Sequence, residues 1–210
     1  NKFYSGKILL STTGCDWELF DSAYEERIAK KFLSENNPRI VGYVGNISAF
    51  RLDFELISEI VCKCKDLDFV FAGPVEKDRE TQDWIMKLNL FKNIKFTGEI
   101  GYQDVPKLID SFSVGIIPYK LNSFNLGTNP NKFFEYSAMA VPCVSTEIPS
   151  LRKFLPYIRI SNNSDSLQKH ICEAINDGKE NSKKLRSIAF NSSPASSLKR
   201  IEMTIVNSIV

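Results

Sequence analysis

The feature that most constrains the fold of this chain is an alternation of short apolar runs with longer stretches whose apolar residues recur at helical spacing. The runs at residues 40–45, 69–72 and 114–117 are nearly continuous and end at glycine or proline, as expected for strands buried on both faces. Residues 54–61 and 105–112 carry apolar side chains on one helical face. Strands that alternate with helices predict βαβ units and a parallel sheet. We therefore expect an α/β protein with a Rossmann-like, doubly wound sheet.

The same signals extend this order along the chain. Further strands are expected at residues 7–10, 93–97, 141–145 and 157–160. Further helices are expected at residues 21–37 with a stop at Pro38, at 84–88, after Pro130 in a first-turn position, and from 166 onward with a break at Pro194. A loop rich in Asn, Ser and Gly is expected at 122–129. The chain is interpreted as one domain, with a lead-in segment and helix at 1–38, a Rossmann-like core at 39–178 and extra C-terminal helices at 179–210.

Composition and charge exclude several kinds of protein. A formal net charge of +2 gives no reason to expect nucleic acid as a partner. The 5 cysteines lack CxxC spacing and there is a single histidine, His170, which argues against a metal site and against Ser-His-Asp chemistry. We therefore expect no metal or other cofactor, and reduced cysteines in a cytoplasmic protein. No apolar run reaches the length of a spanning helix and no signal peptide is visible. Because the chain starts at Asn1 rather than methionine, we expect residues upstream to be missing.

The loop after the strand at 40–45 is the first candidate binding segment. In a doubly wound sheet, ligands bind beyond the carboxyl ends of the strands, where the strand order reverses. Gly42 and Gly45 have GxxG spacing, and the amides of such a loop and of the following helix suit a phosphate. Arg51 would reach a diphosphate from the same loop. Two simpler interpretations stay open, namely that Gly45 only lets the chain turn and that Arg51 is a solvated surface residue.

Two further places at this edge carry candidate residues. Gly98 would let a flat base lie against the main chain, or it is simply part of a turn. After Pro130, Lys132 falls in the first turn of a helix, where the dipole disfavours a cation unless an anion arrives. Glu135 follows one turn later on the same face. The alternative is an exposed Lys–Glu pair beside aromatic core residues.

Six segments in the same order resemble the C-terminal half of group 1 glycosyltransferases with the GT-B fold. They are residues 11–16 with Phe20, the strand and glycine loop at 41–45, the strand at 69–74, N-I-K-F-T-G at 93–98, the strand at 114–119, and P-x-K-x-x-E-Y at 130–136 with V-P-C-V-S at 141–145. The last segment resembles the signature P-x-K-x-x-E-Y-x-A-x-G-x-P-V-V. The resemblance covers about residues 7–144 and implies the donor-binding, C-terminal domain of a GT-B enzyme.

The resemblance also implies roles for individual positions. Glu135 would hold the ribose hydroxyls of a nucleotide-sugar donor, and main chain near Gly98 would border the base. The glycine loop, here Gly45 and Asn46, would face the diphosphate, and Arg51 partly meets the basic pair expected after it. The start of the last matched helix would lie near the diphosphate and the sugar. Its residues are Asn129, Pro130, Asn131 and Lys132.

Two departures limit what the resemblance implies. Many members have a second glutamate eight residues before the first, in contact with the donor sugar, and here that position is Gly127. The glycine usually found before Pro-Val-Val is Ala140. The contacts to the donor sugar must therefore differ from the family pattern, and no catalytic residue is assigned.

From these observations we expect a domain that binds a nucleoside-diphosphate sugar, a UDP-sugar, for transfer to a glycan or lipid-linked acceptor. The resemblance implies retention of configuration and no need for a metal. The N-terminal acceptor domain is absent from this sequence, so the isolated domain is expected to be inactive. The expected partners are the N-terminal domain, the donor, the acceptor and a membrane that is contacted peripherally. Two alternatives stay open: a non-catalytic nucleotide-binding module, and a sugar-nucleotide 2-epimerase, which would need a cluster of histidine and acidic residues.

Overall fold

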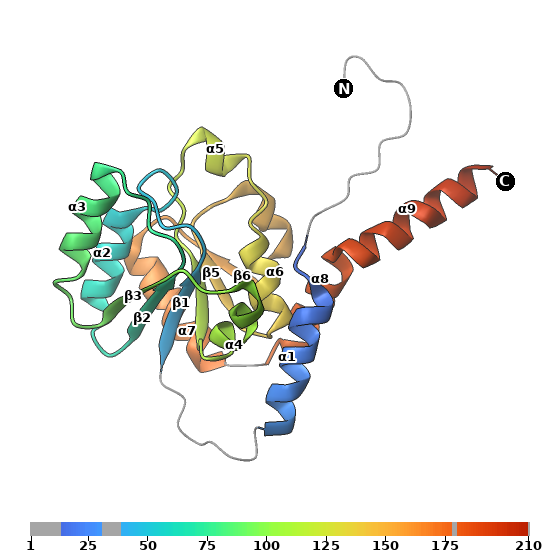
Figure 1. Ribbon diagram of the computed structural model, residues 1–210, viewed down its shortest axis with the longest axis horizontal. Coiled ribbons are helices and arrows are strands. Elements are labelled where there is room, and N and C mark those ends of the chain that lie inside the picture. Colours follow the sequence, from blue (N-terminus) through green and yellow to red (C-terminus); the bar gives the residue numbers. More distant parts are fainter. Residues whose placement is uncertain (1–13, 31–38, 178–179, 210) are drawn as a thin grey trace.

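The computed structural model describes residues 14–30, 39–177 and 180–209. Their centre is a six-stranded parallel sheet with the order β3-β2-β1-β4-β5-β6 (Figure 1). The strands are β1 (Ile40–Val44), β2 (Asp68–Ala72), β3 (Ile94–Gly98), β4 (Val114–Ile117), β5 (Cys143–Ser145) and β6 (Ile158–Ile160). This order confirms the predicted doubly wound sheet, because the chain builds outward from β1 to β3 and then returns to the other side of β1 at β4. The strand predicted at residues 7–10 lies outside the described residues.

Helices cover both faces of the sheet. They are α1 (Trp17–Lys30), α2 (Phe54–Lys63), α3 (Arg79–Leu88), α4 (Val105–Asp110), α5 (Ser123–Leu126), α6 (Asn131–Ala138), α7 (Ser164–Asp177), α8 (Ser182–Ser192) and α9 (Pro194–Ile209), with 3-10 turns η2 (Tyr102–Asp104) and η3 (Pro149–Phe154). α2 packs against α7, whereas α1 packs against α4 and α6, and α6 packs against α8. Two helical layers therefore enclose the sheet, as the nearly continuous apolar strands require.

The helix α6, which carries the predicted binding residues, is held firmly on the sheet. A Cβ at Gly115 would overlap the ring of Tyr136, so only glycine allows this close approach. The Tyr136 hydroxyl accepts a hydrogen bond of 3.3 Å from the amide nitrogen of Val44. Phe133 and Phe134 are fully buried, and each such burial contributes roughly 1.5–3 kcal/mol. The orientation of α6 relative to β1 and β4 is therefore fixed by packing.

Two predicted boundaries are corrected by the structure. Pro130 is the N-cap of α6 with an extended ψ of 114°, not a residue of the first turn. Either position suits proline, because neither needs its missing N–H. The predicted loop at 122–129 contains the one-turn helix α5. This turn forms because the Asn122 side chain accepts a 2.8 Å hydrogen bond from the amide of Asn125.

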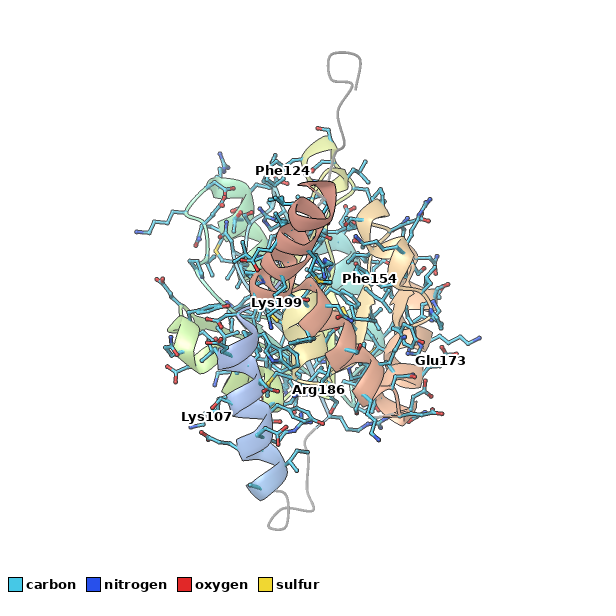
Figure 2. The ribbon with its side chains drawn as sticks, turned by 90° about the vertical axis from the view of Figure 1, so that its right-hand side faces the viewer. Lys107, Phe124, Phe154, Glu173, Arg186 and Lys199 are labelled. Atoms are coloured by element: carbon cyan, nitrogen blue, oxygen red, sulfur yellow. The ribbon has the colours of Figure 1, made fainter. Side chains whose placement is uncertain are left out.

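Two arginines tie the lead-in helix and α8 to the C-terminal end of α6. An Nη1 of Arg27 donates to the carbonyl oxygen of Met139 at 2.9 Å. Arg186 on α8 donates to the carbonyl oxygen of Ala138 at 2.7 Å (Figure 2). Cations at a helix C-terminus complement its dipole. The lead-in helix, which begins at Trp17 and not at the predicted residue 21, is thereby fixed to the core.

The last helix, α9, extends away from the body of the domain (Figure 1), and its main packing partner is α8. Its side chains Leu198, Met203 and Ile205 are exposed. The break between α8 and α9 at Pro194 confirms the prediction. Within the described ranges, none of the helices has both the length and the apolar composition needed to cross a membrane.

Candidate functional site

The carboxyl ends of β1, β2 and β3 turn through glycines with positive φ, namely Gly45 (142°), Gly73 (138°) and Gly98 (76°). The amide of Gly45 donates to the carbonyl of Ala72 at 2.8 Å, and the amide of Gly73 donates to the carbonyl of Gly98 at 2.8 Å. A Cβ at Gly73 would overlap the carbonyl of Gly45, whereas a Cβ at Gly98 would meet nothing within 4 Å. This edge, formed by Gly45, Gly73 and Gly98 and called the glycine edge below, is therefore a strip of main chain without side chains that is open above Gly98. The positive φ values explain why glycine occupies these positions.

Lys132 lies directly over the first of these turns. A Cβ at Gly45 would overlap Cε and Nζ of Lys132, so the lysine side chain fills the space that glycine leaves. Its Nζ lies 5.4 Å from the centre of the Tyr43 ring. The Tyr43 hydroxyl donates to the carbonyl of Asn46 at 2.9 Å, which holds the loop beneath the ammonium. The structure thus brings together the predicted residues of the glycine loop and of α6.

Glu135 lies one turn after Lys132 on the same helix and is half-buried. Burial raises the pKa of the Glu135 carboxyl, and the charge of Lys132 acts in the opposite direction. Over the described parts of the chain, neither side chain has an ion-pair partner within 4.0 Å. The alternative of an exposed Lys–Glu pair would have the two charges in direct contact. In the structure Lys132 and Glu135 do not form such an ion pair.

The N-terminus of α6 offers further unpaired groups. No side chain caps this helix, whose N-cap is Pro130. Asn131 is exposed, and Asn129 has a buried Oδ1 without a hydrogen-bond partner among the described residues. First-turn amides at a helix N-terminus, together with the dipole, favour an anion. With Lys132 above Gly45, the surroundings of this helix end suit a phosphate.

The other two predicted diphosphate ligands are engaged elsewhere in this structure. The Asn46 side chain donates to Glu76 at 2.6 Å. The guanidinium of Arg51 lies 5.4 Å from the ring centre of Tyr119 and 5.3 Å from that of Phe124. Phe124 belongs to α5 and lies near the top of the view in Figure 2. Asn46 and Arg51 are at the predicted edge of the sheet, and neither side chain forms a hydrogen bond or ion pair with Lys132 among the described residues.

Two residues that the sequence interpretation missed lie close to Glu135. The Cys15 thiol donates to the carbonyl of Phe134 at 3.5 Å. Burial, with the charge of Glu135 as the second cause, raises the pKa of Cys15 to about 12. The pKa of Tyr102 is also raised, first by burial and then by the charge of Glu135. The lead-in segment and the β3–α4 connection therefore both approach the Glu135 carboxylate.

One cavity among the described residues lies away from the candidate site. A cavity of about 170 Å³ is lined by Asp53, Glu80, Trp84 and Lys120, among others, and does not include Lys132 or Glu135. The candidate site is an open edge of the sheet, which is the shape expected of one wall of a cleft. In the described ranges no group of three or more His, Cys, Asp or Glu side chains could hold a metal ion. His170 lies on α7, 3.4 Å from Glu173, and so does not join the site.

Comparison with known proteins identifies the family of this chain. Residues 38–177 match the family described as glycosyl transferases group 1. The chain belongs to the group 1 glycosyltransferases. The residues that match the family include all six strands, the glycine edge, α6 and α7.

Individual proteins give the same picture. The chain is 29% identical over 153 residues to the putative teichuronic acid biosynthesis glycosyltransferase TuaH of Bacillus subtilis, covering 72% of this chain and 38% of TuaH. A glycosyltransferase from Rickettsia africae superimposes with a TM-score of 0.71 at 17% identity, over 99% of this chain and 59% of that one. Anabaena HepE in complex with UDP-glucose superimposes with a TM-score of 0.66 at 16% identity, over 92% of this chain and 56% of that one.

The chain covers only part of each of these three proteins. It spans 38% of the length of TuaH and a little over half of the solved glycosyltransferase chains. The superpositions support the fold, and they agree with the predicted C-terminal domain of a GT-B enzyme.

Proposed function

We propose that this chain is the donor-binding half of a glycosyltransferase and that it binds a nucleoside-diphosphate sugar, a UDP-sugar, along the glycine edge. The observation that carries the proposal is the placement of Lys132 and Glu135. A cation and a carboxylate project from one face of α6 at the strand-order reversal, and neither has an ion-pair partner within 4.0 Å among the described residues. A ligand that carries both an anion and vicinal hydroxyls satisfies both groups at once.

Each part of such a donor has a matching surface. The diphosphate faces Lys132, the Gly45 turn and the N-terminus of α6, where amides and dipole favour negative charge. The ribose faces Glu135, because a carboxylate accepts hydrogen bonds from two hydroxyls. The base faces the bare main chain beside Gly98. The sugar lies beyond the diphosphate near Asn129, whose buried Oδ1 lacks a partner in the part of the chain described here.

The arrangement also suits the chemistry of transfer. When the bond from the sugar to the diphosphate breaks, negative charge develops on the leaving phosphate. Lys132 and the α6 amides are already in place to stabilise that charge, so the site supplies by itself the role that a metal plays elsewhere. We place transfer to a glycan or lipid-linked acceptor, with retention of configuration, in the full-length enzyme. That enzyme would act in the cytoplasm and contact a membrane peripherally where its acceptor is lipid-linked.

Arg51 and Asn46 require movement to join this site. Arg51 stacks on Phe124 and Tyr119 and Asn46 is bonded to Glu76, so their contacts to a diphosphate would form only when the donor or the other domain arrives. Gly127 leaves the usual position of a sugar-binding glutamate without a side chain. This absence favours a second candidate function, a nucleotide-binding module that does not catalyse transfer.

A thermal-shift screen followed by calorimetry tests the proposal. UDP and UDP-sugars should raise the melting temperature of this chain more than GDP, ADP or their sugars. Lys132→Ala should abolish most of the UDP shift, whereas Lys169→Ala, which removes an exposed lysine of the surface pair on α7, should leave it unchanged. A chain that shows no shift with any nucleotide would refute donor binding. A larger shift with GDP or ADP would overturn the choice of UDP.

A further inference from the structure

Tyr102 is an aromatic side chain at the glycine edge to which the proposed function gives no role. It begins the 3-10 turn η2, four residues after Gly98. Its side chain is 48% exposed, although the ring meets the fully buried ring of Phe20 at a centroid distance of 6.3 Å and an angle of 64°. One part of the ring is thus anchored on α1 while about half of the residue remains accessible.

The main chain between Gly98 and Tyr102 has unpaired polar groups. The carbonyl of Gly98 accepts from Gly73, and the carbonyl of Gly101 accepts from the amide of Asp104 at 2.9 Å. In the described part of the chain, Glu99 and Ile100 form no backbone–backbone hydrogen bond in this connection. Their N–H and C=O groups are therefore free to pair with the edge of a planar ring, which needs donors and acceptors side by side.

Tyr102 also lies near enough to Glu135 to be affected by its charge. The charge of Glu135 contributes, after burial, to the raised pKa of Tyr102. Independently of charge, the Cys15 thiol bonds to the carbonyl of Phe134, next to Glu135, and the lead-in helix that follows Cys15 carries Phe20 against Tyr102. The ring is thus connected through the lead-in segment to the helix that carries the proposed ribose ligand.

We propose that Tyr102 is the stacking residue for the nucleobase of the donor. The inference rests on the proposed function and extends it. The ring packs against the face of the pyrimidine while the unpaired main chain of Glu99 and Ile100 meets its edge. Stacking suits this position because a base presents a flat apolar face, and an exposed ring anchored at one edge is already ordered. The alternative is that Tyr102 only packs α1 against η2 through Phe20.

Calorimetry with UDP and uridine separates the two roles. Tyr102→Ala should weaken both ligands about fivefold or more, since removing an aromatic platform costs at least about that much. Tyr102→Phe should bind both within about twofold of the unmodified chain. Lys132→Ala, in contrast, should weaken UDP and spare uridine. The matched control is Phe190→Ala, because Phe190 is 46% exposed and packs edge-on against Trp17 of the same helix α1. It should leave both affinities unchanged.

A spectroscopic readout tests stacking directly. In Tyr102→Trp, UDP and uridine should quench the added fluorescence, whereas pyrophosphate and ribose 5-phosphate should not. Phe190→Trp should show no quenching by any of them. If Tyr102→Ala does not fold, Tyr102→Trp and Tyr102→Phe still decide the question. Unchanged affinity in Tyr102→Ala, or an unquenched Tyr102→Trp that binds UDP, overturns the stacking role and leaves the proposed function standing. Failure of the unmodified chain to bind any nucleotide overturns the proposed function itself.

Discussion

The side chain of Lys132 occupies the space that a Cβ would take at Gly45, so the ammonium of α6 and the first turn of the sheet edge are in direct contact. This contact joins a residue after β1 to a residue after β4, the two neighbouring strands at which the order reverses. A substitution at position 45 therefore reaches the proposed phosphate site without removing any charged group.

Gly45→Ala should weaken UDP binding at least about tenfold, because the new methyl group displaces the lysine. It should also destabilise the chain by about 1–3 kcal/mol, since φ at this position is 142°. Gly101→Ala is the matched control. Its φ is −63° and its Cβ would meet Asp104 at 3.5 Å, an ordinary contact. Calorimetry and thermal melting of both variants measure the difference, and equal behaviour of the two would contradict the role of Gly45.

Glu135→Gln should lower UDP affinity about tenfold or more, because it loses the charge and half the acceptor capacity toward the ribose. Lys132→Ala should weaken UDP and spare uridine, which has no phosphate for the ammonium to meet. Calorimetry with UDP, uridine and 2′-deoxy-UDP separates the two residues. If Glu135→Gln distinguishes UDP from 2′-deoxy-UDP as well as the unmodified chain does, Glu135 is not a ribose ligand.

The half-buried Glu135 also predicts a change of stability with pH. Its pKa is raised in the folded chain, so the folded state holds the proton more tightly than the unfolded state. The stability that protonated Glu135 contributes is fully present below the pKa of this carboxyl in the unfolded chain. It is lost as the pH rises through the pKa of the same carboxyl in the folded chain. At pH 7 the charged carboxylate therefore costs stability, and Glu135→Gln should melt higher than the unmodified chain. At pH 4 the difference in melting temperature should vanish. A Glu135→Gln variant that melts lower at pH 7 would mean that the carboxylate stabilises the empty fold.

The doubly wound parallel sheet was predictable because the signal that places each strand is local. Strands buried on both faces must be nearly continuous apolar runs, and β4 (Val114–Ile117) is such a run with proline directly after it. The glycine edge followed from the same reasoning, since left-handed turns require glycine at positions such as Gly98. The sequence did not predict α5, because its single turn depends on one cap, the Asn122 side chain.

The surroundings of Glu135 could not be read from spacing. Cys15 reaches the carbonyl of Phe134 across 119 residues of sequence, and this contact depends on how the lead-in helix packs. Asn46 follows the glycine of the loop, which suggests a diphosphate contact, yet its side chain is bonded to Glu76 from the neighbouring loop. Long-range partners of this kind are set by tertiary packing, and no local pattern encodes them.

Removal of residues 195–210 should lower the melting temperature of this chain by no more than about 2–4 °C. The reason is that α9 leaves the body of the domain with Leu198 and Ile205 exposed, and packs mainly on α8. We propose that Leu198 and Ile205 contact the other domain of the full-length enzyme. Arg186→Ala is the contrasting variant, since it removes the bond to Ala138 and should cost about 1.5–3 kcal/mol. A large loss on truncation would mean that α9 belongs to the fold of this domain.

The isolated chain should bind nucleotide and transfer no sugar. Transfer requires the acceptor hydroxyl and the donor to be held at reacting distance, and this positioning accounts for a large part of the rate that an enzyme achieves. The candidate site is an open edge rather than a closed pocket, so this chain holds the donor on one side only. Incubation with UDP-sugars and candidate acceptors, followed by mass spectrometry of the products, should give no glycosylated product, while the same preparation binds UDP in calorimetry. Transfer by residues 1–210 alone would show that the acceptor site is complete within this chain.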